Sequence, residues 1–182
     1  MQIVQTGFEG LVEIHPKIIK DSRGYFFESF RQDVFDELGL DSNFVQDNQS
    51  YSEKGVVRGL HLQLPPHGQI KLVRCVLGKV LDVVVDVRES SKTFGKSYQV
   101  ELDSYRCNML YIPSGFAHGI AVIENAIFSY KCSSYYNKDA EAGISYNDKD
   151  LNINWGIESP IVSEKDTLLP GFKTYCDQHG LG

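Results

Sequence analysis

The stretch VVRGLHLQLPPHGQIKLVR, from Val56 to Arg74, has ends with the alternating pattern of half-buried β-strands. It is nevertheless rich in charged and hydrogen-bonding side chains, namely Arg58, His61, Gln63, His67, Gln69, Lys71 and Arg74. Polar groups inside a folded protein must be paired or must face a ligand cavity. This stretch therefore predicts strands that line a pocket.

Outside this stretch, the chain continues mainly in short strand-like segments. Residues 10–20 are rich in β-branched residues and are interrupted by Pro16, and a turn at residues 21–24 precedes an aromatic strand. Further strands are predicted at YQVELD, NMLYIPSG, HGIAVIE and AIFSYKCSSYY, within residues 98–136. Many antiparallel strands and few helices predict an all-β jelly-roll barrel, which can be polar inside where it encloses a cavity.

Residues 71–88, KLVRCVLGKVLDVVVDVR, are predicted to form a hairpin that turns near Gly78. In the second arm, two sets of residues alternate: Leu81, Val83, Val85 and Val87 on one side, and Asp82, Val84 and Asp86 on the other. This alternation is typical of a strand with two different faces.

The best helix candidate is FRQDVFDELGL, at residues 30–40. Phe30, Val34, Phe35 and Leu38 fall on one helical face, and Gly39 supplies a stop. The tail after Trp155 has weaker strand character, and we expect it to wrap the barrel or to form short helices.

Composition limits the possible classes of protein. A length of 182 residues predicts one domain over residues 1–182, and 42% hydrophobic residues allow a sizeable core. The net charge of -6 argues against nucleic-acid binding through a basic face. No segment has the length of a membrane span, and the N-terminus lacks the features of a signal peptide. Four widely spaced cysteines indicate reduced thiols and a cytoplasmic protein.

A metal site would need several converging histidine or acidic side chains. A cupin-type barrel often supplies two of them as His-x-His, but this chain has His61-Leu62-Gln63 at the matching place. The segment IPSGFAH, which ends at His118, resembles the second cupin motif. Two histidines without the paired motif make a poor metal site, so the sequence predicts a metal-free cupin-type double-stranded β-helix with a few short helices.

Seven motifs follow one another in a specific order: KDSRGYFFESF, FVQDNQSYSEKGVVRGLHLQ, QIKLVRCVLGKVLDVVVDVR, SKTFG, IPSGFAHG, YKC and SEKD. Together they resemble the dTDP-4-dehydrorhamnose 3,5-epimerase family, the metal-free cupin enzymes of dTDP-L-rhamnose synthesis. The resemblance runs from about Val12 to Asp166, and the tail from about residue 167 is less characteristic. It implies epimerisation at C3 and C5 of a dTDP-linked 4-keto-6-deoxyhexose without a cofactor, a homodimer, and no nucleic-acid or membrane partner.

Four residues match the catalytic positions of this family. By resemblance, His61 is the base, a role that suits imidazole because free imidazole side chains titrate at about pH 6.5, near neutral pH. Asp166 matches the carboxylate that orients this histidine, and Lys71 matches the cation that stabilises an enolate oxygen. Tyr130 matches the acid that returns a proton from the opposite side.

The resemblance also implies a set of residues that bind the substrate. Arg23 and Arg58 match positions near the diphosphate, where a guanidinium group suits phosphate oxygens. His118 matches a position in the sugar pocket, and Tyr136 matches an aromatic near the thymine. The motifs that line the nucleoside and sugar contribute Phe26, Glu28, Gln46 and Asn48.

Strict alternation along a regular strand would place Arg58 and His61 on opposite faces. Both can face one cavity if the strand has a bulge or kink at Gly59, because glycine often marks such a site. The assignment of both residues to one pocket therefore predicts an irregularity at Gly59.

Three alternatives to double epimerisation remain open at this point. Related enzymes invert only C3 or only C5, and pocket shape rather than the type of base or acid decides between these outcomes. Related barrels are 3,4-ketoisomerases, although the set of His61, Tyr130 and Asp166 favours epimerisation. The third alternative is a non-catalytic sugar-nucleotide-binding barrel, which would need neither a base nor its acidic partner.

Overall fold

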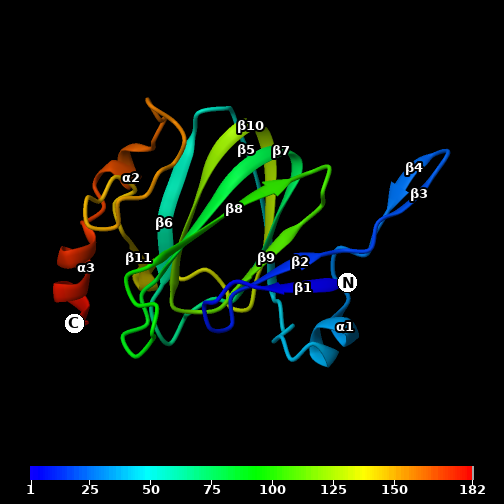
Figure 1. The fold of residues 1–182 in the computed structure, drawn as a ribbon. Helices are drawn as coiled ribbons and strands as arrows, with labels where there is room; N and C mark the ends of the chain where they lie inside the picture. The colour runs from blue at the N-terminus through cyan, green and yellow to red at the C-terminus, as the bar shows by residue number, and fades with distance from the viewer. Residues whose placement is uncertain (182) are drawn as a thin grey trace.

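The computed structural model describes residues 1–181 of the chain as a barrel of antiparallel strands with few helices (Figure 1). The all-β prediction is confirmed. In chain order the elements are β1 (Gln2–Gln5), β2 (Val12–His15), β3 (Ile19–Asp21), β4 (Gly24–Phe26), α1 (Gln32–Glu37), β5 (Gln46–Ser52), β6 (Val57–Gln63), β7 (Lys71–Asp86), β8 (Ser97–Asp103), β9 (Met109–Ile112), β10 (Phe116–Cys132), a 3₁₀ turn (Lys138–Ala140), β11 (Glu141–Gly143), α2 (Glu164–Thr167) and α3 (Phe172–His179).

Two long strands, β7 and β10, pair with each other along most of their lengths and join the two layers of the barrel. The first half of β7 pairs with β9, and the second half pairs with β8. β10 pairs with β6 near its beginning and with β5 near its end. One layer therefore has the order β8-β7-β10-β6-β11 and the other β1-β2-β9-β7-β10-β5. This is the jelly-roll architecture that the sequence predicts.

The predicted hairpin at Gly78 is wrong, because β7 runs without reversal from Lys71 to Asp86. Gly78 instead lies at an irregularity in the pairing with β10, with φ at +75°. A Cβ there would lie 2.1 Å from the carbonyl oxygen of Asn125. A glycine with positive φ serves a bulge as well as a turn. Local sequence does not distinguish the two, and here pairing of both halves with β10 makes the bulge.

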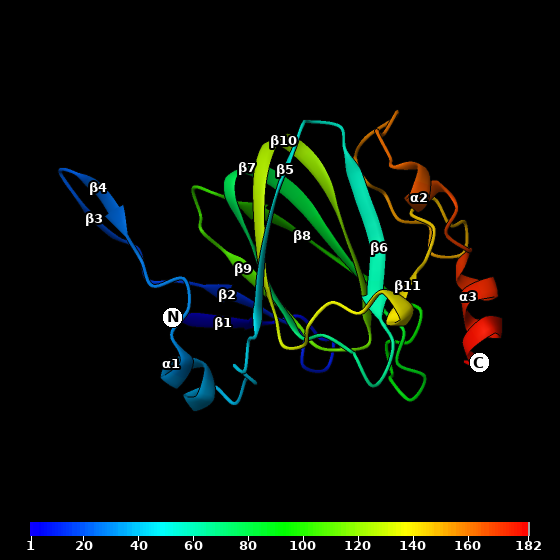
Figure 2. The same ribbon diagram turned by 180° about the vertical axis from the view of Figure 1, so that it is seen from behind.

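Apolar side chains are buried on both faces of the strands. Val80 and Val84 of β7 point into the barrel, whereas Val83 and Val85 pack outside it. The C-terminal segment covers this outer face through residues that include Trp155. The tail thus wraps the barrel and forms the short helices α2 and α3, as expected (Figures 1 and 2).

Helix α1 is confirmed, although it has only six residues. Phe35 is its buried residue, and its ring packs against Phe30 and covers the other layer together with Phe44. Gly39 follows the helix with φ at +71°, which agrees with its predicted role as a stop.

The β3–β4 hairpin projects away from the barrel on the side opposite to α3 (Figures 1 and 2). Three apolar side chains on it are more than half exposed, those of Ile19, Tyr25 and Phe26. No helix among the described residues is long and apolar enough to cross a membrane. The four cysteines are all buried and unpaired.

Candidate active site

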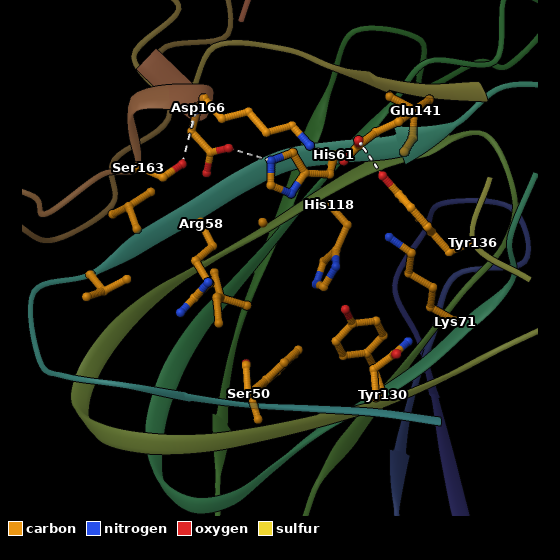
Figure 3. A pocket seen from close by; sticks show the side chains of 18 of the residues that line it. Ser50, Arg58, His61, Lys71, His118, Tyr130, Tyr136, Glu141, Ser163 and Asp166 are labelled. Atoms are coloured by element: carbon orange, nitrogen blue, oxygen red, sulfur yellow. Dashed lines mark hydrogen bonds and ion pairs between the residues drawn. The ribbon is translucent and has the colours of Figure 1, made fainter. Parts of the chain in front are cut away.

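A pocket of about 800 Å³ opens into the barrel and contains most of the residues that the sequence singled out. Figure 3 shows it with its principal polar side chains. Nine of the twelve predicted site residues line this pocket: Gln46, Asn48, Arg58, His61, Lys71, His118, Tyr130, Tyr136 and Asp166.

An irregularity at Gly59 brings Arg58 and His61 into the same pocket. His61 is opposite His118 on β10 and Arg58 is opposite Ile120, so β6 contains one residue more than β10 between these pairs. Gly59 has φ at +127°, and a Cβ there would lie 2.5 Å from the backbone of Gly119. The predicted irregularity is confirmed, and only glycine fits this close approach.

His61 and Asp166 form a hydrogen-bonded pair, with Nε2 of the imidazole 2.8 Å from Oδ1 of the carboxylate. The other oxygen of Asp166 accepts a hydrogen bond of 3.2 Å from the backbone N–H of Gly59. Burial alone would raise the pKa of Asp166, but the hydrogen bond and charge of His61 outweigh it, and the net shift is downward. The carboxylate is therefore ionised at neutral pH and fixes the orientation of His61.

Asp166 reaches the pocket because the tail folds back over β6. Ser163 caps α2, and its hydroxyl accepts a hydrogen bond from the backbone N–H of Asp166. The carboxylate is 105 residues away from His61 in sequence, and only the path of the tail brings the two together. Figure 3 shows the pair at one side of the pocket, with Ser163 beside it.

A second His–Asp pair lies deeper in the barrel, and its acidic partner was missed in the sequence. Nε2 of His118 is 2.9 Å from Oδ2 of Asp82, and both side chains are buried. Oδ1 of Asp82 has no hydrogen-bond partner among the described residues. The sequence did contain a clue to this pair. Asp82 lies in the valine-rich run VLDVVVD, and a carboxylate buried among valines requires a partner.

Tyr130 and Lys71 come from β10 and β7, and in Figure 3 they lie across the pocket from the His61–Asp166 pair. Burial raises the pKa of Tyr130, although the positive charge of Arg58 opposes this shift. The phenol is therefore protonated at neutral pH and can donate a proton. Burial likewise lowers the pKa of Lys71 below its ordinary value of 10.5, although nearby negative groups that include Asp82 oppose this shift.

Lys71→Met should make the protein more stable and less active. No carboxylate among the described residues lies within ion-pair distance of the Lys71 amine, so the folded state retains a poorly compensated charge. Removing it should raise Tm by about 2–4 °C, the shift that ~1 kcal/mol gives at this size. Differential scanning calorimetry at pH 7 measures this.

The increase in stability expected for Lys71→Met should depend on pH in a definite direction. The pKa of Lys71 is lower in the folded protein than in the unfolded chain, so the unfolded chain binds this proton more tightly. The charged amine therefore lowers the free energy of unfolding at pH values below the folded pKa. The advantage of Lys71→Met should therefore shrink as the pH rises towards 10.5. A variant less stable than wild type at pH 7 would contradict this account.

Two further charged residues at the pocket mouth were missed in the sequence. Glu141 accepts hydrogen bonds from the hydroxyl of Tyr136 at 2.9 Å and from the amine of Lys165 at 2.6 Å. Burial would raise the pKa of Glu141, but Lys165 and Tyr136 lower it overall. Lys165 belongs to the SEKD motif and was the available clue, whereas Glu141 lies in no motif recognised beforehand.

Three predicted substrate-binding residues do not line the pocket of this chain. Arg23 and Phe26 are on the projecting β3–β4 hairpin, and Glu28 follows it. The guanidinium of Arg23 is paired with Asp21 at 2.6 Å, and Glu28 contacts Arg31 at 3.3 Å. A single chain therefore does not bring these three residues to the pocket.

Gln63 occupies the place of the second cupin histidine, and its amide binds backbone groups of two loops. No group of three or more His, Cys, Asp or Glu side chains in residues 1–181 is arranged to hold a metal ion. The pocket thus offers an oriented imidazole, an ammonium group and a phenol within one barrel. This fold and pocket define the class of cupin-type enzymes that transfer protons.

More particularly, the chain belongs to the dTDP-4-dehydrorhamnose 3,5-epimerase family, whose model matches residues 5–174. An enzyme of that name from Shigella flexneri is 49% identical over 91% of this chain and 93% of its own length. The crystal structure of dTDP-6-deoxy-D-glucose-3,5-epimerase from Legionella pneumophila, in complex with dTDP-4-keto-L-rhamnose, is 43% identical with a TM-score of 0.90. It matches over 94% of this chain and 93% of that chain.

The same fold also occurs in an enzyme of narrower activity. The 3'-monoepimerase ChmJ from Streptomyces bikiniensis, in complex with dTDP-quinovose, is 36% identical with a TM-score of 0.88. The match covers 96% of this chain and 89% of that chain. Similarity of fold alone therefore does not fix how many carbons are inverted.

Proposed function

We propose that this chain inverts C3 and C5 of dTDP-4-dehydro-6-deoxy-D-glucose to give dTDP-4-dehydro-L-rhamnose, in dTDP-L-rhamnose synthesis. The observation that carries the proposal is the arrangement of one pocket, with the His61–Asp166 pair on one side and Tyr130 and Lys71 across from it. Family membership supplies the substrate class. The enzyme acts in the cytoplasm, in keeping with its four unpaired thiols.

The C4 ketone makes the protons on C3 and C5 acidic, because the electrons of the broken C–H bond can delocalise onto the ketone oxygen. His61 takes the proton, and Asp166 stabilises the imidazolium that forms. Lys71 stabilises the negative oxygen of the enolate. Tyr130 then gives a proton to the opposite face of the same carbon, the ketone re-forms, and the configuration is inverted.

Proton NMR of the reaction in heavy water tests this function. Inversion at both carbons should replace the protons of C3 and C5 with deuterium in the product. Labelling of a single carbon would favour a C3-only or C5-only epimerase, as ChmJ shows for this fold. A chain that binds the nucleotide sugar without any exchange would be a binding protein.

The remaining pocket residues bind the substrate in this proposal. Arg58 and His118 contact the diphosphate and the sugar, and Gln46 and Asn48 line the sugar and nucleoside end. Tyr136 packs against the thymine. The exposed position of Tyr136 at the pocket mouth and its hydrogen bond to Glu141 support this role.

The enzyme is a homodimer in which the β3–β4 hairpin of each subunit completes the pocket of the other. Two observations support this arrangement. Arg23, Phe26 and Glu28 match ligand-binding positions of the family but lie outside the pocket of their own chain. The hairpin that carries Arg23 and Phe26 also exposes apolar side chains, as an interface segment would.

Co-expression of two variants with weakened dTDP binding tests the shared site. Arg23→Ala and Arg58→Ala should each weaken dTDP binding by about 1.5–3 kcal/mol, the range for hydrogen bonds to charged groups. In mixed dimers, one pocket carries both changes and the other carries neither, so about a quarter of all pockets should regain wild-type affinity. Calorimetric titration with dTDP counts these pockets, and no recovery would contradict a site shared between subunits.

A further inference from the structure

The loop that carries Tyr136 is held by three glutamine side chains from different parts of the chain. The amide of Gln69 donates to the carbonyl of Ser134 at 2.8 Å. The amide oxygen of Gln46 accepts from the backbone N–H of Tyr136 at 2.9 Å. Gln63 contributes the remaining bonds to this loop. Side chains thus hold four consecutive residues, 134–137, by their backbone groups.

Gln63 makes the largest contribution to this clamp. Its amide nitrogen donates to the carbonyl of His67 at 2.8 Å and to that of Tyr135 at 3.3 Å. Its amide oxygen accepts from the backbone N–H of Asn137 at 2.6 Å. The bonds to Tyr135 and Asn137 hold the backbone on both sides of Tyr136. Both amide hydrogens are used, so Gln63 has none left for a ligand, although it lines the pocket.

The opposite end of Tyr136 is also fixed. Its hydroxyl donates to Glu141, which follows the 3₁₀ turn that Asn137 caps. His67 bonds to the side chain of Asn137 at 3.1 Å and so joins the same network. The ring of Tyr136 is nevertheless 54% exposed at the pocket mouth, where little packing restrains it. Its orientation therefore depends on hydrogen bonds at both ends, to the backbone around Tyr136 and from the hydroxyl to Glu141.

We propose that Gln63 is a positioning residue for nucleotide binding, which holds Tyr136 in the orientation that receives the base. The inference rests on the proposed function, because it takes Tyr136 as the contact of the thymine. Gln63 stands where many cupin-type barrels have a metal-binding histidine. Here its side chain instead joins the 64–67 loop to the 133–137 loop. A prepositioned aromatic ring spares the ligand the cost of ordering it.

Gln63→Met tests this role, because methionine has a similar volume but forms none of the three bonds. The Kd for dTDP and the KM should each rise about tenfold, near what loss of one base–aromatic contact costs. The kcat should stay within about twofold. Isothermal titration with dTDP and steady-state kinetics measure these quantities.

Asn108→Leu is the matched control, because Asn108 is a buried amide that clamps a different loop. It donates to the carbonyl of Glu101 at 2.9 Å and accepts from the N–H of Asp103 at 3.1 Å, away from the pocket. Both variants should lower Tm, but only Gln63→Met should change the affinity for dTDP. Equal effects of the two variants on dTDP affinity would reduce Gln63 to a structural residue and overturn the proposal.

A double-mutant cycle with Tyr136→Ala separates positioning from general destabilisation. If Gln63 acts through Tyr136, Gln63→Met should weaken dTDP binding little further once the ring is absent. Additive losses would overturn the proposal. If Gln63→Met does not fold, Gln69→Met tests the same clamp from a half-buried residue; a Kd raised about threefold would support the proposal, and an unchanged Kd would overturn it.

Failure of this inference can be distinguished from failure of the proposed function. A wild-type chain that binds dTDP while Gln63→Met binds it equally well would overturn the inference alone. A wild-type chain that does not bind dTDP would overturn the proposed function together with the inference.

Discussion

His61→Ala should stop both proton exchange and inversion, because in the proposed mechanism His61 is the base that forms the enolate. General-base catalysis typically contributes about 10²–10⁴ in rate. Loss of the imidazole also leaves Oδ1 of the buried Asp166 without its hydrogen bond, so some loss of stability should accompany the loss of rate. The expected result in heavy water is unchanged substrate, with no deuterium at C3 or C5.

His179→Ala is a suitable control for this experiment. His179 lies in α3, is exposed, and contacts Tyr175 rather than the pocket. The His179→Ala variant should catalyse proton exchange and inversion at the wild-type rate. Continued rapid exchange in His61→Ala would show that the base lies elsewhere, and the role given to Asp166 would fail with it.

Tyr130→Phe should separate the two halves of the reaction. His61 can still remove a proton and return a solvent-derived one to the same face, so deuterium should enter without inversion. Loss of the phenol removes the acid on the opposite face, and inversion should slow by about 10²–10⁴. The NMR spectrum should therefore show labelled substrate accumulating faster than labelled product.

Tyr111→Phe controls for loss of a buried hydroxyl outside the pocket. Tyr111 is 5% exposed and its hydroxyl donates to the carbonyl of Asp41 at 3.1 Å. This variant should lose some stability but should keep both exchange and inversion. Inversion at the wild-type rate in Tyr130→Phe would show that Tyr130 is only an aromatic residue of β10.

Much of the candidate site was accessible from sequence because its residues lie in short motifs of recognisable order. Nine of the twelve predicted residues line one pocket, including Arg58 and His61 from the same strand. On a regular strand, Arg58 and His61 would point to opposite faces. Gly59 between them indicated the bulge that lets both face the pocket. Three residues that pair with others at the site were missed: Asp82 and Lys165, which lie inside motifs, and Glu141, which lies in none.

The turn signal at Gly78 shows where local sequence is insufficient. Glycine with positive φ is compatible with a hairpin or with a bulge, and the choice depends on which strands are available to pair. In this protein both halves of β7 pair with the same long strand, β10, and no reversal occurs. The same pairing joins the two strand-like segments after Phe116 into one strand.

The sequence by itself determined the all-β class, the pocket-lining stretch and the chemistry of the side chains. These follow from the period of the hydrophobic pattern and from residue types, which are local properties. The family motifs already paired Asp166 with His61, and the structure shows that bond. Tertiary structure alone decided that Asp82 meets His118 and that Gln63 meets the loop of Tyr136. The physical reason is that such pairs join strands or loops distant in sequence, so the path of the whole chain sets their distances.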